Sequence, residues 1–381
     1  MKVLFILNST CMGGATISFL NLIKGLNERN VKCYVIHPDK SVDPEFKKIV
    51  LPYVDKLYYA HLVMHWHDEQ LDKNLKFRFK RNLKKLLKSI VENIQVKKII
   101  KEVQPDIIHT NVGVIRIGYK LSQKNGIPHI WHIREYQTKD FHNVIEPSKA
   151  KFEEMLKDNY VITITRDILH YFDLENSSKA VCIYDGCYSK NDTTFNFPKK
   201  NYFLCCSRIS EEKGYVDVVK AFAKFHKIYP KYNLLIAGFG NPDYINKLKR
   251  MSGKYGCNNS IKFLGYREDI RDLMDNAQAL IVASRFEGFG RMTAEAAFRG
   301  CTVIGHNTGG TKEVLDITGG FPYENDWKEL EEKMEKVINL SEDEYTEIAT
   351  RARKAAVKNF SNEQYVDKVY KVYLKALNKE I

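Results

Sequence analysis

Short apolar runs alternate with longer amphipathic stretches along the whole chain of 381 residues. The runs predict strands at 2–8, 33–37, 106–111, 129–133 and 160–165, and then at 202–207, 233–237, 260–264, 279–283 and 302–305. They are rich in Val, Ile and Leu and lack polar alternation, which is typical of parallel strands covered on both faces. We therefore predict the α/β fold class, with two successive doubly wound, Rossmann-like units.

A polar segment at 184–197 separates the two series of strands and predicts the domain junction. We expect an N-terminal domain at 1–186 and a second domain at 187–358. The tail is helical by composition, and residues 360–377 are amphipathic, so 359–381 are expected to form a C-terminal helix.

Composition places the chain among folded proteins of a reducing compartment. The hydrophobic fraction is 44%, and the eight cysteines are scattered without a Cys-x-x-Cys pair. No apolar run is long enough for a signal-peptide core or a membrane span, so we expect a cytoplasmic protein.

The net charge of +13 is concentrated in residues 73–101, which contain eleven Lys or Arg residues and a single acid, Glu92. In this segment Leu83, Leu87, Ile90, Val91 and Ile94 recur at helical spacing, with lysines on the other face. A basic amphipathic helix suits an anionic membrane surface, so we expect peripheral binding at the inner face of the membrane through 73–101. Phe77 and Phe79, interleaved with cations, favour this interpretation. The alternative is a solvated helix whose apolar stripe packs on its own sheet.

The segment 284–295, Ser-Arg-Phe-Glu-Gly-Phe-Gly-Arg-Met-Thr-Ala-Glu, carries the most chemistry. It follows a predicted strand and leads into a predicted helix at 291–299. Gly288 and Gly290 let the backbone approach a ligand, and the helix start offers N–H groups to an anion. Glu295 lies among small apolar residues, where a carboxylate needs polar partners such as sugar hydroxyls. The alternative is an exposed helical glutamate, but Glu287 and the glycines beside it favour a ligand site.

This segment resembles the signature of family 4 glycosyltransferases, which have the GT-B fold of two Rossmann-like domains facing across a cleft. In that signature two glutamates, separated by seven intervening residues, enclose a Gly-Phe-Gly sequence. The resemblance implies that Glu287 contacts the donor sugar and that Glu295 holds the ribose hydroxyls. It also implies that the backbone around Gly288, with the amides of Phe289, Gly290, Met292 and Thr293, faces the sugar and the phosphates.

Further matches follow in the order that the family requires. The segment 207–214 resembles the family's Arg and Lys pair, which implies that Arg208 and Lys213 clamp the diphosphate and take part in catalysis. Two fixed cations can neutralise a leaving diphosphate without a metal, and the sequence has no Asp-x-Asp, so we expect neither metal nor cofactor. The alternative is that both are ordinary surface cations. Gly238 lies in a Gly-x-Gly turn, and Tyr266 and Arg267 match the segment that flanks the nucleotide base.

In the first domain, the segment 8–15 matches the family's glycine loop, which implies that Gly13 and Gly14 lie over the diphosphate. The segment 131–135 matches the place where the family has a His, usually followed by Asp. Here Ile133 follows, so His132 alone is carried over as a residue near the reacting sugar, and His109 is a rival for that role. In the family, the C-terminal helix crosses back to the N-terminal domain.

The resemblance implies a retaining glycosyltransferase. The donor is a nucleotide-diphosphate sugar bound mainly to the second domain, and the acceptor is a glycan or a lipid-linked molecule on the first. We expect UDP as the nucleotide, with GDP and ADP open, and a role in cell-surface polysaccharide synthesis such as a capsule or exopolysaccharide. Without an evident nucleophile, same-face attack assisted by the departing phosphate is expected.

Three alternatives stay open on the sequence. A NAD-dependent enzyme is disfavoured because neither glycine loop reads Gly-x-Gly-x-x-Gly. A nucleic-acid-binding protein is disfavoured because the charge is confined to one segment without a recognised motif, so no nucleic acid is expected as a partner. An epimerase or phosphorylase of the same fold is the third, and acceptor-dependent release of nucleotide diphosphate would separate it from a transferase.

Overall fold

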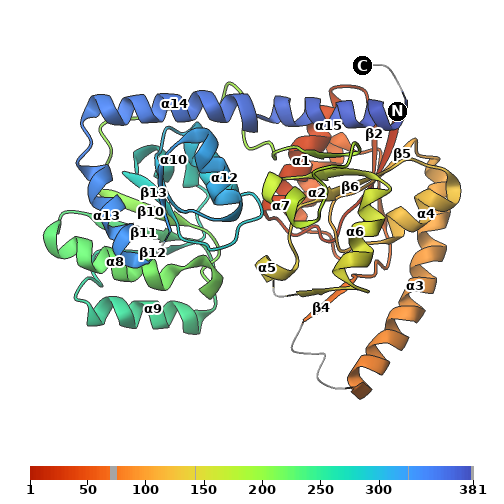
Figure 1. Cartoon of the computed structure of the whole chain (residues 1–381), viewed down its shortest axis with the longest axis horizontal. Coiled ribbons are helices and arrows are strands. Elements are labelled where there is room, and N and C mark those ends of the chain that lie inside the picture. Colours follow the sequence, from red (N-terminus) through yellow and green to blue (C-terminus); the bar gives the residue numbers. More distant parts are fainter. Residues whose placement is uncertain (69–74, 142, 325, 379–381) are drawn as a thin grey trace. The chain divides into compact units, whose positions relative to one another are not determined.

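The computed structural model describes residues 1–68, 75–141, 143–324 and 326–378 (Figure 1). The chain forms two compact units. Unit 1 comprises Met1–Gly186 together with Asn362–Ile381, and unit 2 comprises Cys187–Ser361. The first junction lies at the predicted residue, and the second lies three residues later than predicted.

Unit 1 is built on a seven-stranded sheet in which every neighbouring pair is parallel. Its order is β3 (Lys56–Tyr59), β2 (Lys32–His37), β1 (Lys2–Ile6), β5 (Ile107–Thr110), β6 (His129–Ile133), β8 (Tyr160–Thr163) and β9 (Ala180–Cys182). The chain moves outward from β1 to β3 and then returns to β5 on the other side of β1. The carboxyl ends of β1 and β5 therefore form a topological switch point, where doubly wound sheets bind ligands.

Helices cover both faces of this sheet. The helices of unit 1 are α1 (Gly14–Asn27), α2 (Pro44–Val50), α3 (Leu75–Val103), α4 (Ile117–Asn125), α5 (Thr138–Phe141), α6 (Lys149–Lys157), α7 (Arg166–Tyr171) and α15 (Asn362–Ala376), with a 3-10 turn, η1 (Leu51–Tyr53). One core joins α1, α15 and the sheet, and another joins α3, α4 and the opposite face. A two-stranded antiparallel sheet of β4 (Trp66–Asp68) and β7 (Asn143–Ile145) lies outside the main sheet.

The C-terminal helix α15 belongs to unit 1 although it follows the whole of unit 2 in the chain. It packs against α1, with Tyr365, Val366, Val369 and Tyr373 buried. The approach is close: a Cβ on Gly25 of α1 would come within 2.5 Å of the Val366 side chain.

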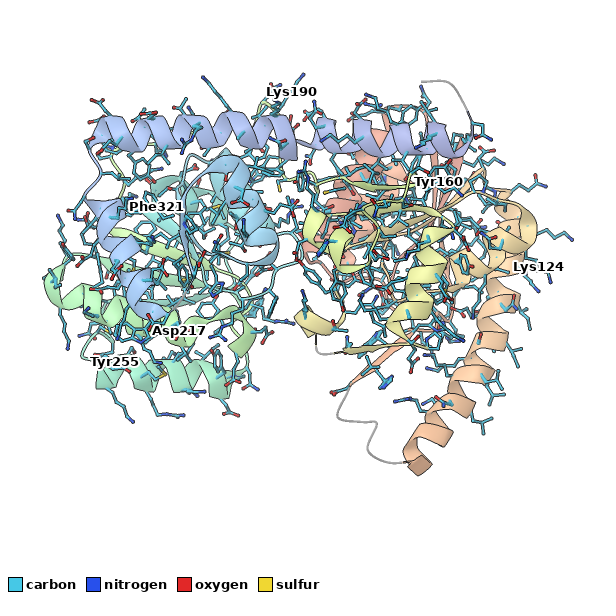
Figure 2. The ribbon with its side chains drawn as sticks, in the orientation of Figure 1. Lys124, Tyr160, Lys190, Asp217, Tyr255 and Phe321 are labelled. Carbon is cyan, nitrogen blue, oxygen red and sulfur yellow. The ribbon has the colours of Figure 1, made fainter. Side chains whose placement is uncertain are left out.

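Unit 2 has a six-stranded parallel sheet. Its order is β12 (Ile261–Gly265), β11 (Asn233–Ala237), β10 (Tyr202–Cys206), β13 (Ala279–Val282), β14 (Val303–His306) and β15 (Phe321–Tyr323). Its helices are α8 (Tyr215–Ile228), α9 (Pro242–Lys254), α10 (Ile270–Asn276), α11 (Arg291–Phe298), α12 (Gly309–Thr318), α13 (Trp327–Ile338) and α14 (Glu342–Phe360), with a 3-10 turn, η3 (Glu211–Lys213). Phe321 at the start of β15 is buried in the core shared with α8 and α13 (Figure 2). The switch point of this sheet lies between β10 and β13.

The ten predicted strands are all present. Five further strands of three or four residues each were not predicted: β3, β4, β7, β9 and β15. Within the described residues, no helix combines the length and the apolar character that crossing a membrane requires.

Candidate functional site

The predicted donor residues of unit 2 gather around the switch point between β10 and β13. The loop after β10 passes through η3 and reverses at Gly214, which has a φ of 71° and caps α8. A Cβ on Gly214 would lie 2.2 Å from the carbonyl oxygen of Ala283, just after β13. Only glycine combines this left-handed conformation with this close approach. The turn therefore holds Lys213 against the segment that carries Glu287.

Lys213 and Glu287 form an ion pair at this point. The Nζ atom of Lys213 lies 2.7 Å from Oε1 of Glu287, and the side chains are 18% and 21% exposed. The Glu287 carbonyl accepts a hydrogen bond of 2.8 Å from the Gly310 amide, which fixes its backbone. Lys213 has three donors and a carboxylate has several acceptor positions, so each can bind a ligand while the other is present.

Glycines shape the entry into α11. Gly290 has a φ of 75° and is the N-cap of α11, without a side-chain capping bond. A Cβ on Gly310 of α12 would lie 2.5 Å from the Phe289 backbone, so α12 presses directly on the glycine loop. The Thr293 amide is already bonded to the Gly290 carbonyl at 2.9 Å, which engages one of the predicted phosphate donors. The helix start remains suited to an anion because its dipole favours negative charge.

Glu295 points back along α11 and is largely buried. Its Oε1 lies 2.7 Å from Nε of Arg291, and both side chains are 13% exposed. Its Oε2 accepts a longer hydrogen bond of 3.4 Å from the Tyr188 hydroxyl. The polar partners that burial requires are therefore Arg291 and Tyr188 within unit 2, partners that sequence analysis did not identify.

Arg208 lies on the exposed side of the same loop. Its side chain is 61% exposed and pairs with Glu212 at 2.9 Å. Gly238 has a φ of 140°, and a Cβ there would lie 2.0 Å from the Ser207 carbonyl oxygen. The loop after β11 thus rests on the residue that precedes Arg208. An open groove of about 870 Å³ borders this loop, and its lining includes Arg208, Ser210, Phe239, Asn241, Tyr244 and Lys247.

Tyr266 and Arg267 follow β12. Arg267 is held by Asp269, with Nε 2.7 Å from Oδ1. Tyr266 stacks on Phe239, with ring centroids 5.4 Å apart and ring planes 5° apart. Both rings are exposed, at 57% and 67%. Exposed aromatic faces suit a nucleobase, and Phe239 was missed because a single aromatic between two glycines gave no periodic signal.

In unit 1, Gly13 and Gly14 join β1 to α1 as predicted, with Gly13 as the N-cap. The loop is anchored upstream, because the Thr10 amide and hydroxyl both donate to Asp39, at 2.5 Å and 2.8 Å. A Cβ on Gly13 would meet no atom within 4 Å, and its φ of −162° is ordinary extended backbone. The fold itself therefore does not require glycine at this position.

His132 lies inside β6 and has no exposed surface. Its Nδ1 is 3.3 Å from Nε2 of His109, and His109 in turn bonds the Tyr373 hydroxyl at 2.7 Å. Burial holds the pKa of both imidazoles well below the usual value, so both rings are neutral. The structure thus places His132 and His109 together in the core of unit 1. A role for His132 near the reacting sugar stays a prediction.

Arg134 is the first residue after β6, and no role was predicted for it. It donates to both carboxylate oxygens of Asp185 at 2.5 Å and 2.6 Å, and to the Tyr365 hydroxyl at 2.9 Å. Asp185 directly precedes the segment that leaves unit 1, and Tyr365 lies on the helix that returns to it. Burial by itself lowers the pKa of the guanidinium, but the Asp185 carboxylate and the Tyr365 hydroxyl together outweigh burial and raise that pKa.

Among the residues that the structure describes, no three or more His, Cys, Asp and Glu side chains are placed to hold a metal ion together.

The second unit is similar to a known family. Residues 190–355 match the family model "Glycosyl transferases group 1". The chain is 23% identical over 368 residues to the glycosyltransferase MJ1178 of Methanocaldococcus jannaschii, covering 95% of this chain and 94% of that protein. It is 27% identical over 227 residues to the poly(glycerol-phosphate) alpha-glucosyltransferase of Bacillus subtilis, covering 58% of this chain and 33% of that one.

Solved structures agree on the fold. Anabaena HepE in complex with UDP and glucose superposes with a TM-score of 0.77 at 19% identity, covering 98% of this chain and 100% of that one. The complex of the same protein with UDP-glucose gives a TM-score of 0.76 at 20% identity. With its parallel sheets and these neighbours, the chain has the GT-B fold, and unit 2 carries a glycosyl transferases group 1 domain.

Proposed function

We propose that this protein is a retaining glycosyltransferase of family 4 that moves a sugar from a nucleotide diphosphate to a glycan or a lipid-linked acceptor. The observation that carries the proposal is the Lys213–Glu287 ion pair, held by glycine turns at the switch point of unit 2 beside the start of α11. A cation and a helix start suit a diphosphate, and a carboxylate suits sugar hydroxyls. The matched family model covers the same residues.

The donor binds along the carboxyl edge of the unit 2 sheet. Lys213, Arg208 and the start of α11 hold the diphosphate, Glu287 holds the sugar, and Glu295 holds the ribose. The exposed rings of Tyr266 and Phe239 offer a surface to the base. UDP is the proposed nucleotide, in line with the UDP and UDP-glucose complexes of HepE.

Fixed positive charge makes the reaction possible. Departure of the nucleotide diphosphate builds negative charge on its outer phosphate, and preorganised cations and amide dipoles stabilise that charge most strongly in the transition state. Lys213 is well placed because its side chain is mostly buried and its ion pair fixes its position. No metal is needed in this scheme, and activity that persists in excess EDTA is the expected result.

The proposed stereochemistry is retention by same-face attack, in which the departing phosphate takes the acceptor proton. The name of the Bacillus subtilis relative, an alpha-glucosyltransferase, is in keeping with this. Proton NMR of the product from an α-linked donor tests it. An α-linked product is expected, and a β-linked product would refute retention.

The acceptor is proposed to bind unit 1 at the inner face of a membrane, in cell-surface polysaccharide synthesis. The apolar stripe of α3 is not packed on its own sheet: Leu83, Leu86, Leu87, Ile90, Val91 and Ile94 are 42–66% exposed. The inner side of the helix is formed by Glu92, Val96 and Ile100, and the N-terminal part of α3 extends away from the sheet of unit 1 (Figure 1). Lysines flank the stripe, as in helices that lie in an anionic membrane surface. Lys73 falls outside the described residues, and the side chains of Phe77 and Phe79 are not described.

Two experiments test the proposal. A screen of nucleotide sugars by thermal shift and slow donor hydrolysis should give one donor, and Glu287→Ala should lower its turnover at least about 100-fold. A loss below tenfold would remove Glu287 from the mechanism. Vesicle flotation should show binding to phosphatidylglycerol vesicles and none to phosphatidylcholine, and Leu87→Gln with Ile94→Gln should abolish it. Equal binding to both vesicles would argue against membrane attachment.

A further inference from the structure

The open groove beside Arg208 is separate from the residues proposed to hold the donor sugar and ribose. Its volume of about 870 Å³ is within the range of small-molecule sites. It lies between η3 and the first turns of α9, on the face of the unit 2 sheet where Tyr244 and Leu248 join the core. Glu295 belongs to α11, whose Ala296 packs on the opposite face. Among the described residues, the lining includes Arg208 but neither glutamate of the proposed donor site.

Two paired loops hold the lining of the groove in place. The Ile209 amide donates to the Phe239 carbonyl at 2.6 Å, and Ile209 is bridged to Gly240. A Cβ on Gly240 would lie 2.2 Å from the Ile209 carbonyl oxygen, so the loops touch through their backbones. Asn241 then caps α9 by accepting from the Asp243 amide at 2.8 Å. The groove is therefore preformed by backbone contacts.

The charges that line the groove cancel. Arg208 pairs with Glu212 at 2.9 Å, and Lys247 pairs with Glu211 at 3.1 Å. The remaining two charged residues of the lining also balance in sign: Asp243 and Arg250. An anionic ligand would have to displace carboxylates that already hold two of the cations, and a cationic ligand would face the same difficulty in reverse. The groove therefore favours a neutral ligand.

Tyr244 brings an unused hydroxyl to this lining. Its side chain is 8% exposed, and its hydroxyl finds no hydrogen-bond partner among the residues that the structure describes. The Nζ atom of Lys247 lies 5.6 Å from the centroid of the Tyr244 ring. Burial, with the nearby charges of Glu211 and Glu212, raises the pKa of Tyr244 to about 12, so the hydroxyl stays protonated and can donate. A buried hydroxyl without a partner is unfavourable, and a polar ligand in the groove would supply one.

Phe239 adds an exposed aromatic ring at the edge of the groove. Tyr266 covers one face of this ring, with the ring planes 5° apart. Phe239 lines the groove whereas Tyr266 does not. Aromatic rings pack their flat faces against the apolar surfaces of ligands. The groove therefore combines an aromatic ring with polar groups of both kinds, donors and acceptors.

We propose that this groove binds a neutral oligosaccharide. Sugar hydroxyls both donate and accept, so they can bond to the carboxylates, the cations and the Tyr244 hydroxyl without disturbing the balance of charge. The C–H face of a sugar ring is an apolar surface that suits Phe239. The bound glycan is a stretch of the acceptor away from the sugar that reacts, and this role rests on the transferase function proposed above.

The test is titration of the full chain with neutral oligosaccharides, followed by saturation-transfer NMR and calorimetry. The probes are maltohexaose, isomaltohexaose, laminarihexaose and cellohexaose, and at least one should bind with a Kd of about 1 mM or tighter. Tyr244→Phe should weaken that binding about three- to tenfold, the loss of one hydrogen bond between neutral groups. Tyr255→Phe, at the other end of α9 and outside the groove, is the matched control and should leave it unchanged (Figure 2).

Failure of all the glycans to bind, or equal affinity in Tyr244→Phe and the parent, would overturn the site. Tyr244→Phe should melt no lower than the parent, because its hydroxyl has no described partner to lose. A lower melting temperature would show that the hydroxyl serves folding and would overturn its assignment to a ligand.

The site and the transferase can fail separately. Acceptor-independent donor hydrolysis should be the same in Tyr244→Phe and the parent, whereas a loss would overturn the separation of the groove from the donor site. Glycan binding that depends on Tyr244, in a chain that transfers no sugar, would support the groove and refute the acceptor role. Sugar transfer by a chain that binds none of the glycans would refute the groove and leave the transferase standing.

Discussion

Replacing Lys213 by Met tests the centre of the proposed mechanism. The change removes one cation beside the departing diphosphate and keeps the length of the side chain. The Lys213 side chain is 18% exposed, so its surroundings screen charge less than water does. At an effective dielectric constant of about 20, a unit charge about 4 Å away is worth roughly 4 kcal/mol. Only part of a charge develops in the transition state, so a loss of about 3–4 kcal/mol, or 100- to 1000-fold in kcat, is expected.

The same substitution leaves Glu287 partly buried without its cation. That should lower the free energy of unfolding by about 1–3 kcal/mol, less than for a fully buried pair. Steady-state donor hydrolysis gives kcat and KM, and urea unfolding gives stability. Lys254→Met, at the exposed end of α9, is the matched control and should change neither quantity. A Lys213→Met enzyme that retains more than a tenth of its kcat would refute the electrostatic reasoning, as would an equal loss in the control.

Three further predictions concern stability and the glycine loops. Burial raises the pKa of Glu92 from 4.5 to about 7, so its contribution to stability is complete below pH 4.5 and is lost as pH rises through 7. The free energy of unfolding of Glu92→Gln, measured in urea, should therefore rise relative to the parent by up to about 3 kcal/mol between pH 5 and pH 8. Parallel pH curves for the two proteins would contradict this. Gly310→Ala should destabilise unit 2 by about 1–3 kcal/mol, because the added methyl group clashes with the Phe289 backbone. Gly13→Ala should leave the melting temperature unchanged but lower donor turnover, and thermal melts with hydrolysis rates measure the two effects. Unchanged turnover in Gly13→Ala would remove that loop from the donor site. Arg134→Met should cost about 3–5 kcal/mol because it leaves Asp185 buried without its cation, and a loss under 1 kcal/mol in calorimetry would show that solvent reaches the carboxylate.

Strands buried on both faces were predictable because each is a continuous apolar run, which can be recognised without knowing the strand that it pairs with. β3 and β9 lie at the edges of their sheet, and β9 is only three residues long, so neither produces such a run. The antiparallel pair of β4 and β7 joins segments about 75 residues apart, and its pairing depends on tertiary contacts that no local pattern records.

The sequence pointed to parts of the candidate site where backbone chemistry constrains the residue. Gly214 and Gly290 lie where a side chain would strike the neighbouring backbone or strain a turn, and both fall in segments that the resemblance covers. Gly310, which approaches the Phe289 backbone, was not predicted. Partners of charged groups were not predictable. The sequence does not show that Arg291 neutralises Glu295, or that Arg134 holds Asp185, because those pairings arise only when separate elements pack.

The discontinuity of unit 1 has a consequence for how the protein is made. A chain leaving the ribosome exposes all of unit 2 before α15 is available to cover α1. Unit 1 would thus begin to be synthesised before unit 2 but would finish folding after it. Domains usually fold in the order in which they are synthesised. Loss of α15 should expose the apolar surface of α1, so a stop codon that precedes α15 would damage a part of unit 1 that had been synthesised much earlier.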